Sequence, residues 1–111
     1  MHISIKTGLE KLIDSKTLFT EVFRHGTLTV EIYKPVEKDL QQPHDRDEVY
    51  IVISGEGEFI SGDNIVSFQP GDFLFVPARV EHRFINFSAD FSTWVFFYGP
   101  KGGEKVKAPM N

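Results

Sequence analysis

Short runs of β-branched, aromatic and aliphatic residues, separated by polar turns, fill most of the chain from Leu18 onward. Such runs are typical of β-strands. Strands are predicted at Leu18–Arg24, Leu28–Tyr33, Glu48–Ser54, Glu58–Ser61, Ile65–Phe68, Phe73–Val76, Glu81–Phe87 and Thr93–Tyr98. In the segment Thr7–Ser15, apolar residues recur at helical spacing and Thr7 is the candidate N-cap, so one short helix is expected. The chain is therefore predicted to be all-β with a short N-terminal helix.

The turns and the faces of these strands indicate how they assemble. Glycine, asparagine, aspartate and proline mark the breaks, as in segments 62–64 and 69–72. Short strands with such turns form sandwiches and barrels. Segments 49–53 and 94–98 are apolar at successive positions, so both of their faces should be covered. One face would line a barrel and the other would contact a second sheet, the N-terminal segment or another subunit, and a homodimer is expected.

Length and charge narrow the class of protein. The 111 residues suit one domain, residues 1–111. The formal charge of −4 comes without a basic stripe, which argues against a nucleic-acid partner. No apolar run approaches the roughly 20 residues of a membrane span and no secretory signal is evident, so a cytoplasmic location is expected. The tail, about residues 100–111, is rich in Gly, Lys and Pro and is expected to be loosely held.

The chain has no cysteine, so any metal ion must bind to nitrogen and oxygen ligands. Two histidines and one carboxylate fall at the ends or beginnings of predicted extended segments: His44, Glu48 and His82. This ligand set is that of a facial triad, which holds iron(II) and related ions and leaves coordination positions open. His82 shares one face of its strand with Phe84, so its side chain is predicted to point inward. The sequence therefore predicts one metal site.

The spacing of these residues resembles that of the cupin superfamily, over about residues 42–86. In the first motif, about 42–55, His44 is followed after three residues by Glu48 and after six more by Gly55. Gln42 stands where cupins have the first histidine of this motif. The resemblance implies a double-stranded β-helix, or jelly-roll barrel.

The second motif, about 71–86, is matched by Gly71, Pro77, His82 and Asn86 at the cupin spacing. Arg79 stands where cupins have a glycine. It is either a solvated turn residue or a group at the pocket rim that meets an anionic substrate.

The resemblance implies that His44, Glu48 and His82 bind one divalent ion: iron, manganese, nickel or zinc. Gln42 either completes this set through its amide oxygen, as zinc-dependent phosphomannose isomerases pair Gln and His, or faces the pocket without coordinating. The predicted substrate pocket consists of aromatic side chains assigned to inward positions, which otherwise fill the core, together with Arg79. These residues are Tyr33, Tyr50, Arg79, Phe84, Trp94, Phe96 and Tyr98.

Two functions follow from the resemblance. The first is a metalloenzyme acting on a small oxygen-bearing molecule, dioxygenase-like in the first place and an isomerase, cyclase or lyase in the second. The second is a non-catalytic cupin that binds or senses a small sugar or carboxylate. The substitution of the first histidine by Gln42 favours the second reading slightly, and fold alone does not choose between them.

Overall fold

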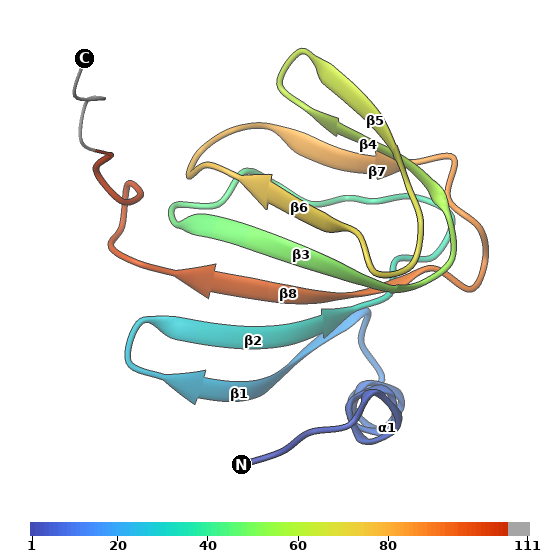
Figure 1. The fold of residues 1–111 in the computed structure, drawn as a ribbon. Helices are drawn as coiled ribbons and strands as arrows, with labels where there is room; N and C mark the ends of the chain where they lie inside the picture. The colour runs from blue at the N-terminus through green and yellow to red at the C-terminus, as the bar shows by residue number, and fades with distance from the viewer. Residues whose placement is uncertain (107–111) are drawn as a thin grey trace.

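The computed structural model describes residues 1–106, in which two antiparallel sheets lie over each other with one helix outside (Figure 1). The elements are α1 (Ile5–Ser15), β1 (Phe19–His25), β2 (Leu28–Tyr33), β3 (Asp47–Ser54), β4 (Gly57–Ser61), β5 (Asn64–Phe68), β6 (Phe73–Val76), β7 (His82–Ile85) and β8 (Ser92–Tyr98). One sheet has the order β1-β2-β8-β3-β6 and the other β5-β4-β7. The predicted all-β jelly roll with an N-terminal helix is confirmed, and the predicted elements agree with these bounds to within a few residues.

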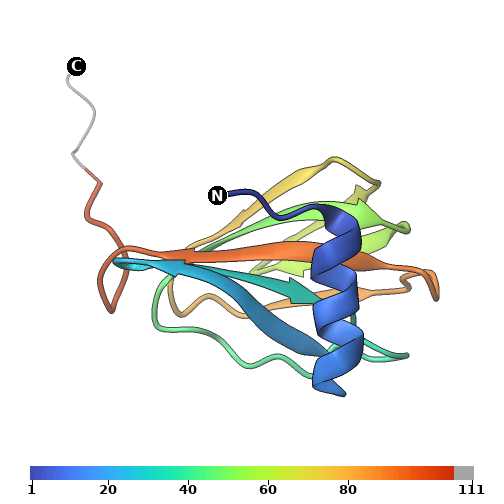
Figure 2. The same cartoon turned by 90° about the horizontal axis from the view of Figure 1, so that it is seen from below.

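The helix begins two residues before its predicted start. Ser4 is the N-cap and its Oγ accepts a hydrogen bond from the backbone N–H of Thr7 at 3.0 Å, so Thr7 lies inside the first turn. Gly8 is buried, and an added Cβ would lie 2.2 Å from Cδ1 of Ile32. Figure 2 shows α1 lying across the outer side of the larger sheet. The helix therefore covers part of that sheet and leaves the rest open.

The interior between the sheets is mainly aromatic. Phe84 on β7 is 1% exposed, and its ring centroid lies 4.6–5.5 Å from those of the rings that surround it. These rings are Tyr50, Phe59, Phe68 and Phe91. Rings at such distances add favourable edge and offset contacts to the burial of apolar area. Phe84 therefore links the two sheets. Of its two predicted roles, lining the pocket or filling the core, the structure shows the second.

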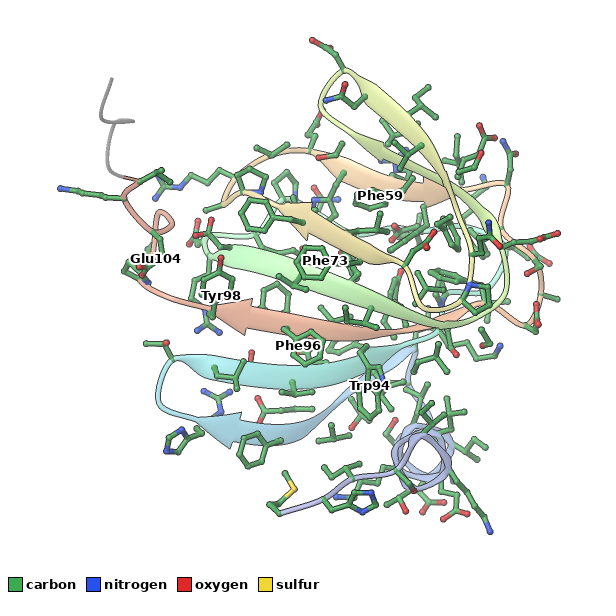
Figure 3. All side chains as sticks on the ribbon, in the orientation of Figure 1. Phe59, Phe73, Trp94, Phe96, Tyr98 and Glu104 are labelled. Atoms are coloured by element: carbon green, nitrogen blue, oxygen red, sulfur yellow. The ribbon has the colours of Figure 1, made fainter. Side chains whose placement is uncertain are left out.

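The outer face of the larger sheet carries two apolar rows that cross four strands. In one row Ile51 pairs with Phe73 on one side and Trp94 on the other, and in the next row Val49 pairs with Phe75 and Phe96. With their partners on β2, these residues form what we call the outer apolar face: Val30, Ile32, Val49, Ile51, Phe73, Phe75, Trp94 and Phe96. Figure 3 shows Phe96 and Trp94 on β8 and Phe73 on β6, with β3 between these two strands.

The beginning of the C-terminal tail is held in place, contrary to the prediction of a loose segment. The backbone N–H of Gly102 donates to the carbonyl of Asp45 at 2.6 Å, and that of Glu104 donates to Oδ2 of Asp47 at 2.8 Å. Nζ of Lys101 lies 3.7 Å from the Asp45 carboxylate. The buried carboxylate of Asp47 needs backbone donors, and the tail supplies one of them. Residues 107–111 of the predicted loose tail lie outside the described residues.

Candidate metal centre

His44, Glu48 and His82 converge although they come from different parts of the fold. Glu48 points inward from β3, His82 opens β7 of the other sheet, and His44 lies in the loop before β3. One ligand atom from each lies within 4.8 Å of the others, in a cluster that could hold a metal ion. Glu48 is 1% exposed and His82 6% exposed, whereas His44 is half-buried. The predicted ligands are therefore together at the edge of the core.

The contacts of His82 determine which of its nitrogens faces the cluster. Its Nδ1 lies 2.9 Å from the carbonyl oxygen of Val80, and a carbonyl can only accept. Nδ1 therefore carries a hydrogen, so in the neutral ring Nε2 has its lone pair free. The Nε2 atom lies 3.0 Å from Oε1 of Glu48. A histidine held in this way through its other nitrogen is typical of metal ligands.

Two electron-rich atoms at this distance need a cation between them. Within residues 1–106, neither carboxylate oxygen of Glu48 nor Nε2 of His82 has a hydrogen-bond partner, and all three atoms are buried. Such groups are costly to bury unless a proton or a metal ion satisfies them. Metal bonds of about 2.0–2.2 Å place neighbouring ligand atoms roughly 3–4 Å apart. The separations here, 3.0 Å from Glu48 Oε1 to His82 and 4.0 Å to His44, fit that requirement.

The two histidines differ in their affinity for a proton. Burial disfavours the charged ring of His82, but the contacts with Glu48 and with the Val80 carbonyl outweigh it and raise the pKa of His82 above its ordinary value. Burial lowers the pKa of His44, despite the attraction of Glu48. His44 is therefore a neutral ring at physiological pH, which is the form that binds a metal.

Gln41 contacts the candidate ligand His44, and both Gln41 and Gln42 line a surface cavity with His82. The side chain of Gln42 is exposed and, with His82, lines a surface cavity of about 250 Å³. Oε1 of Gln41 accepts a hydrogen bond from the hydroxyl of Tyr50 at 3.0 Å and lies 3.4 Å from Nε2 of His44. Gln42 was placed by its position in the first cupin motif, and residues 39–44 do not form a regular strand here. The sequence signal that could have pointed to Gln41 is that two glutamines, Gln41 and Gln42, are adjacent.

Strand β8 has the opposite phase to the one predicted from the sequence. Tyr50, which is buried, pairs with Val95, so Val95 faces inward and its neighbours Trp94 and Phe96 face outward. Trp94 and Phe96 line a separate outer cavity. Tyr98 shares their phase. A shift of one residue exchanges the faces of a strand, and a strand that is apolar on both faces gives no signal of its phase.

A cavity of about 290 Å³ opens beside His44 on the inner side of the larger sheet. Its lining is Phe19, Glu31, Tyr33, Gln41, His44, Val95 and Phe97. Of the predicted pocket residues, Tyr33 lies in this lining, and Tyr50 contacts it through Gln41. The sequence analysis did not predict Glu31 as a pocket residue. Its position, two residues from each of the inward-facing Thr29 and Tyr33 on β2, could have indicated that it also faces inward. Burial, followed by the charges of Glu21 and Glu48, raises the pKa of Glu31.

Arg79 is exposed and lies in the turn before β7. Its φ of 69° is in the left-handed region, which explains why a glycine suits this position in cupins. Its backbone N–H donates to the carbonyl of His44 at 2.6 Å, and its Nε lies 3.6 Å from Asp45. The backbone of Arg79 therefore supports the loop that carries His44, while its side chain pairs with that loop at the surface.

Arg79→Gly is expected to leave metal binding intact and to change the free energy of unfolding by less than about 1 kcal/mol. The loss of an exposed ion pair is offset by the removal of a side chain from a left-handed conformation. Chemical denaturation and metal titration of both proteins test this. A large loss of affinity for a small anion would instead place the guanidinium in ligand binding.

The two sheets around an aromatic core, with histidines and a carboxylate beside it, define a jelly-roll β-protein with a candidate metal site. Residues 29–98 match the family described as "Cupin domain", and this chain belongs to the cupin family. An uncharacterized protein of Streptomyces coelicolor is 38% identical over 85 residues, which is 75% of this chain and 81% of that protein.

Solved structures show the same fold. Protein NMB1881 of Neisseria meningitidis matches with a TM-score of 0.69 and 20% identity, over 89% of this chain and 100% of that chain. A cupin-2 domain containing protein of Shewanella frigidimarina matches with a TM-score of 0.62 and 18% identity, over 82% and 91% of the two chains.

Among residues 1–106, no helix combines the length and apolar character that a membrane span requires. The cytoplasmic location and the lack of a nucleic-acid partner stay predictions of the sequence.

Proposed function

We propose that this cupin binds one divalent metal ion on His44, Glu48 and His82 and acts on a small oxygen-bearing molecule. The observation that carries the proposal is the buried contact between the free Nε2 of His82 and the unpartnered carboxylate of Glu48. Nitrogen and oxygen donors suit iron, manganese, nickel and zinc. When bound, the ion would supply Lewis acidity or, if it is iron, the activation of oxygen.

The chain's own residues define what reaches this site. The cavity of about 290 Å³ is small, and Phe19, Val95 and Phe97 give it apolar walls. These walls favour a compact, partly apolar substrate and exclude water from the ligands. Glu31 is the carboxylate of this lining, and its raised pKa suits it to hold or accept a proton near a bound molecule. We favour a dioxygenase-like reaction first and an isomerase, cyclase or lyase second.

A non-catalytic role is the alternative, in which the same pocket binds a small sugar or carboxylate. Replacement of the usual first histidine by glutamine favours it. The two functions differ in the effect of His82→Ala: an enzyme loses turnover, whereas a binding protein loses affinity for its ligand and forms no product at any stage.

Elemental mass spectrometry of the protein purified without a polyhistidine tag tests metal binding directly. We expect close to one metal ion per chain in the wild type and almost none in the His44→Ala, His82→Ala double variant. His25→Ala is the matched control, because His25 is an exposed histidine on β1. Absence of metal from the wild type after reconstitution would contradict the proposal and favour a metal-free binding protein.

We also propose that the outer apolar face is covered by a second copy of the chain. Phe73 is 63% exposed and Phe75 45% exposed, and a lone protein rarely leaves so continuous an apolar patch open. The face crosses four strands, which lie about 4.8 Å apart, and its residues are uncharged; α1 covers it at Ile32, and it is open around Phe73 and Phe75. Two such faces can therefore meet across a twofold axis without charge repulsion.

The Phe73→Glu, Phe75→Glu double variant is expected to convert a dimer into a monomer, because two charges per chain would be buried at the interface. Sedimentation velocity measures the change, and metal content should stay that of the wild type. Ile65→Glu is the control, since Ile65 is 59% exposed but lies on the other sheet. A wild-type protein that sediments as a monomer would contradict the dimer.

A further inference from the structure

We infer that Gln41 is a fourth protein donor of the metal site and that Asp39 is the positioning residue that directs its amide oxygen to the ion. This inference rests on the proposed function, since it concerns the same site. Neither residue belongs to the three-residue cluster predicted from the sequence. Both lie in the loop between β2 and β3, outside regular strands.

Asp39 is a buried carboxylate that is completely engaged by hydrogen bonds. It is 3% exposed. Its Oδ1 accepts from the hydroxyl of Tyr33 at 2.7 Å and from the backbone N–H of Gln41 at 3.1 Å. Its Oδ2 accepts from Nε2 of Gln41 at 3.0 Å and from the backbone N–H of Phe84 at 2.8 Å. These bonds connect the loop to β2 and to β7, so Asp39 holds it in one position.

The contact with Asp39 decides which end of the Gln41 amide faces the site. A carboxylate only accepts hydrogen bonds, so the NH₂ group of Gln41 must point to Asp39. The amide oxygen then points the other way, where the hydroxyl of Tyr50 donates to it at 3.0 Å. The hydroxyl of Tyr50 can donate or accept, so the contact with the Asp39 carboxylate is the one that assigns the ends of this amide.

The oriented oxygen lies next to the candidate ligands. Oε1 of Gln41 is 3.4 Å from Nε2 of His44, which is within the roughly 3–4 Å that separates neighbouring ligands of one ion. Nε2 of His44 is in turn 4.0 Å from Oε1 of Glu48. Amide oxygens are neutral donors to divalent ions. The donor set is then two imidazoles, one carboxylate and one amide oxygen.

The pair can be tested by reversing its polarity. In Asp39→Asn, one end of the side chain becomes a donor and conflicts with the NH₂ group of Gln41 or with the fixed backbone N–H groups. The Gln41 amide should then turn over and present NH₂ to the metal, which cannot coordinate. In the Asp39→Asn, Gln41→Glu double variant, the asparagine NH₂ donates to a carboxylate and an oxygen again faces the site, while the backbone N–H of Phe84 is left without its acceptor.

The experiment uses cobalt(II) as the probe, with its visible absorption spectrum and a chelator competition as readouts. We expect Gln41→Leu and Asp39→Asn each to weaken cobalt binding about 10- to 100-fold and to change the spectrum. The double variant should recover the spectrum and part of the affinity, because the backbone N–H of Phe84 still lacks its acceptor. Gln42→Leu is the matched control and should behave as the wild type. A merely structural Asp39 would not be rescued by the double variant.

The outcomes separate this inference from the proposed function. If the wild type binds no cobalt, the metal site itself is wrong. If the wild type binds cobalt and Gln41→Leu keeps the same affinity and spectrum, only the role of Gln41 is overturned. A change with Gln42→Leu but not with Gln41→Leu would assign the donor to Gln42. Circular dichroism confirms that each variant is folded, and Gln41→Leu tests the donor even if Asp39→Asn unfolds.

Discussion

Glu48→Gln is expected to abolish metal binding and, at pH values above the folded-state pKa of His82, where the two side chains no longer form an ion pair, to stabilise the metal-free protein. The carboxylate of Glu48 is 1% exposed and has no hydrogen-bond partner within the described part of the chain. A glutamine of nearly the same shape removes this buried charge, which should raise the free energy of unfolding by about 1–3 kcal/mol. A purely structural glutamate would show the opposite sign.

The pH dependence gives this prediction a second observable. In the metal-free wild type, His82 has a pKa above its ordinary value of 6.5 because of its contacts with Glu48 and Val80. A raised folded-state pKa contributes stability below pH 6.5, and that contribution is lost as the pH rises through the folded-state pKa. The advantage of Glu48→Gln should therefore grow from acidic to alkaline pH.

Urea denaturation across this pH range, with and without added zinc, measures both effects. Saturating metal should stabilise only the wild type, by about 4 kcal/mol at a thousand times the dissociation constant. Glu56→Gln is the control, because Glu56 is an exposed glutamate on the turn before β4. Equal stabilisation of Glu48→Gln by zinc would show that the metal site lies elsewhere.

Gly55→Ala is expected to remove a large part of the stability of the fold. Gly55 has a φ of 84° in the turn between β3 and β4. An added Cβ would lie 2.5 Å from Cα and 2.8 Å from N of Phe91, which are backbone atoms that cannot turn aside. The clash and the left-handed conformation together should cost more than about 3 kcal/mol, a substantial share of the 5–15 kcal/mol of a typical domain.

Gly62→Ala is the matched control for this effect. Gly62 also has a positive φ, 56°, but nothing lies within 4 Å of an added Cβ, so its cost should be about 1 kcal/mol. Thermal or urea unfolding of the three proteins compares the two costs. If both variants lose the same stability, the approach of the Phe91 backbone does not explain the glycine at position 55.

The fold could be predicted from the sequence because its signals are local. Turn residues and β-branched runs located each strand, and the cupin spacing identified His44, Glu48 and His82, which the structure brings together. Motif spacing sufficed for these three residues because Glu48 and His82 lie at the beginnings of strands and His44 lies in the loop just before β3.

The loop residues could not be placed in the same way. Gln41 and Gln42 are adjacent and identical, and the position of each depends on the hydrogen bonds that Asp39 makes to β2 and β7. Such long-range contacts have no periodic signature in the sequence. The phase of β8 was unreadable for another reason: both of its faces are apolar, since one lines the interior and the other belongs to the outer apolar face.

The sequence by itself therefore determined the all-β class, the family and three candidate ligands, because strand propensity, turn chemistry and motif spacing act over a few residues. Only the tertiary structure decided that Gln41 contacts His44, which side of β8 lines the interior, and that Glu31 enters the cavity. These features depend on which segments distant in sequence meet, and packing and hydrogen bonds fix that only when both sheets are assembled.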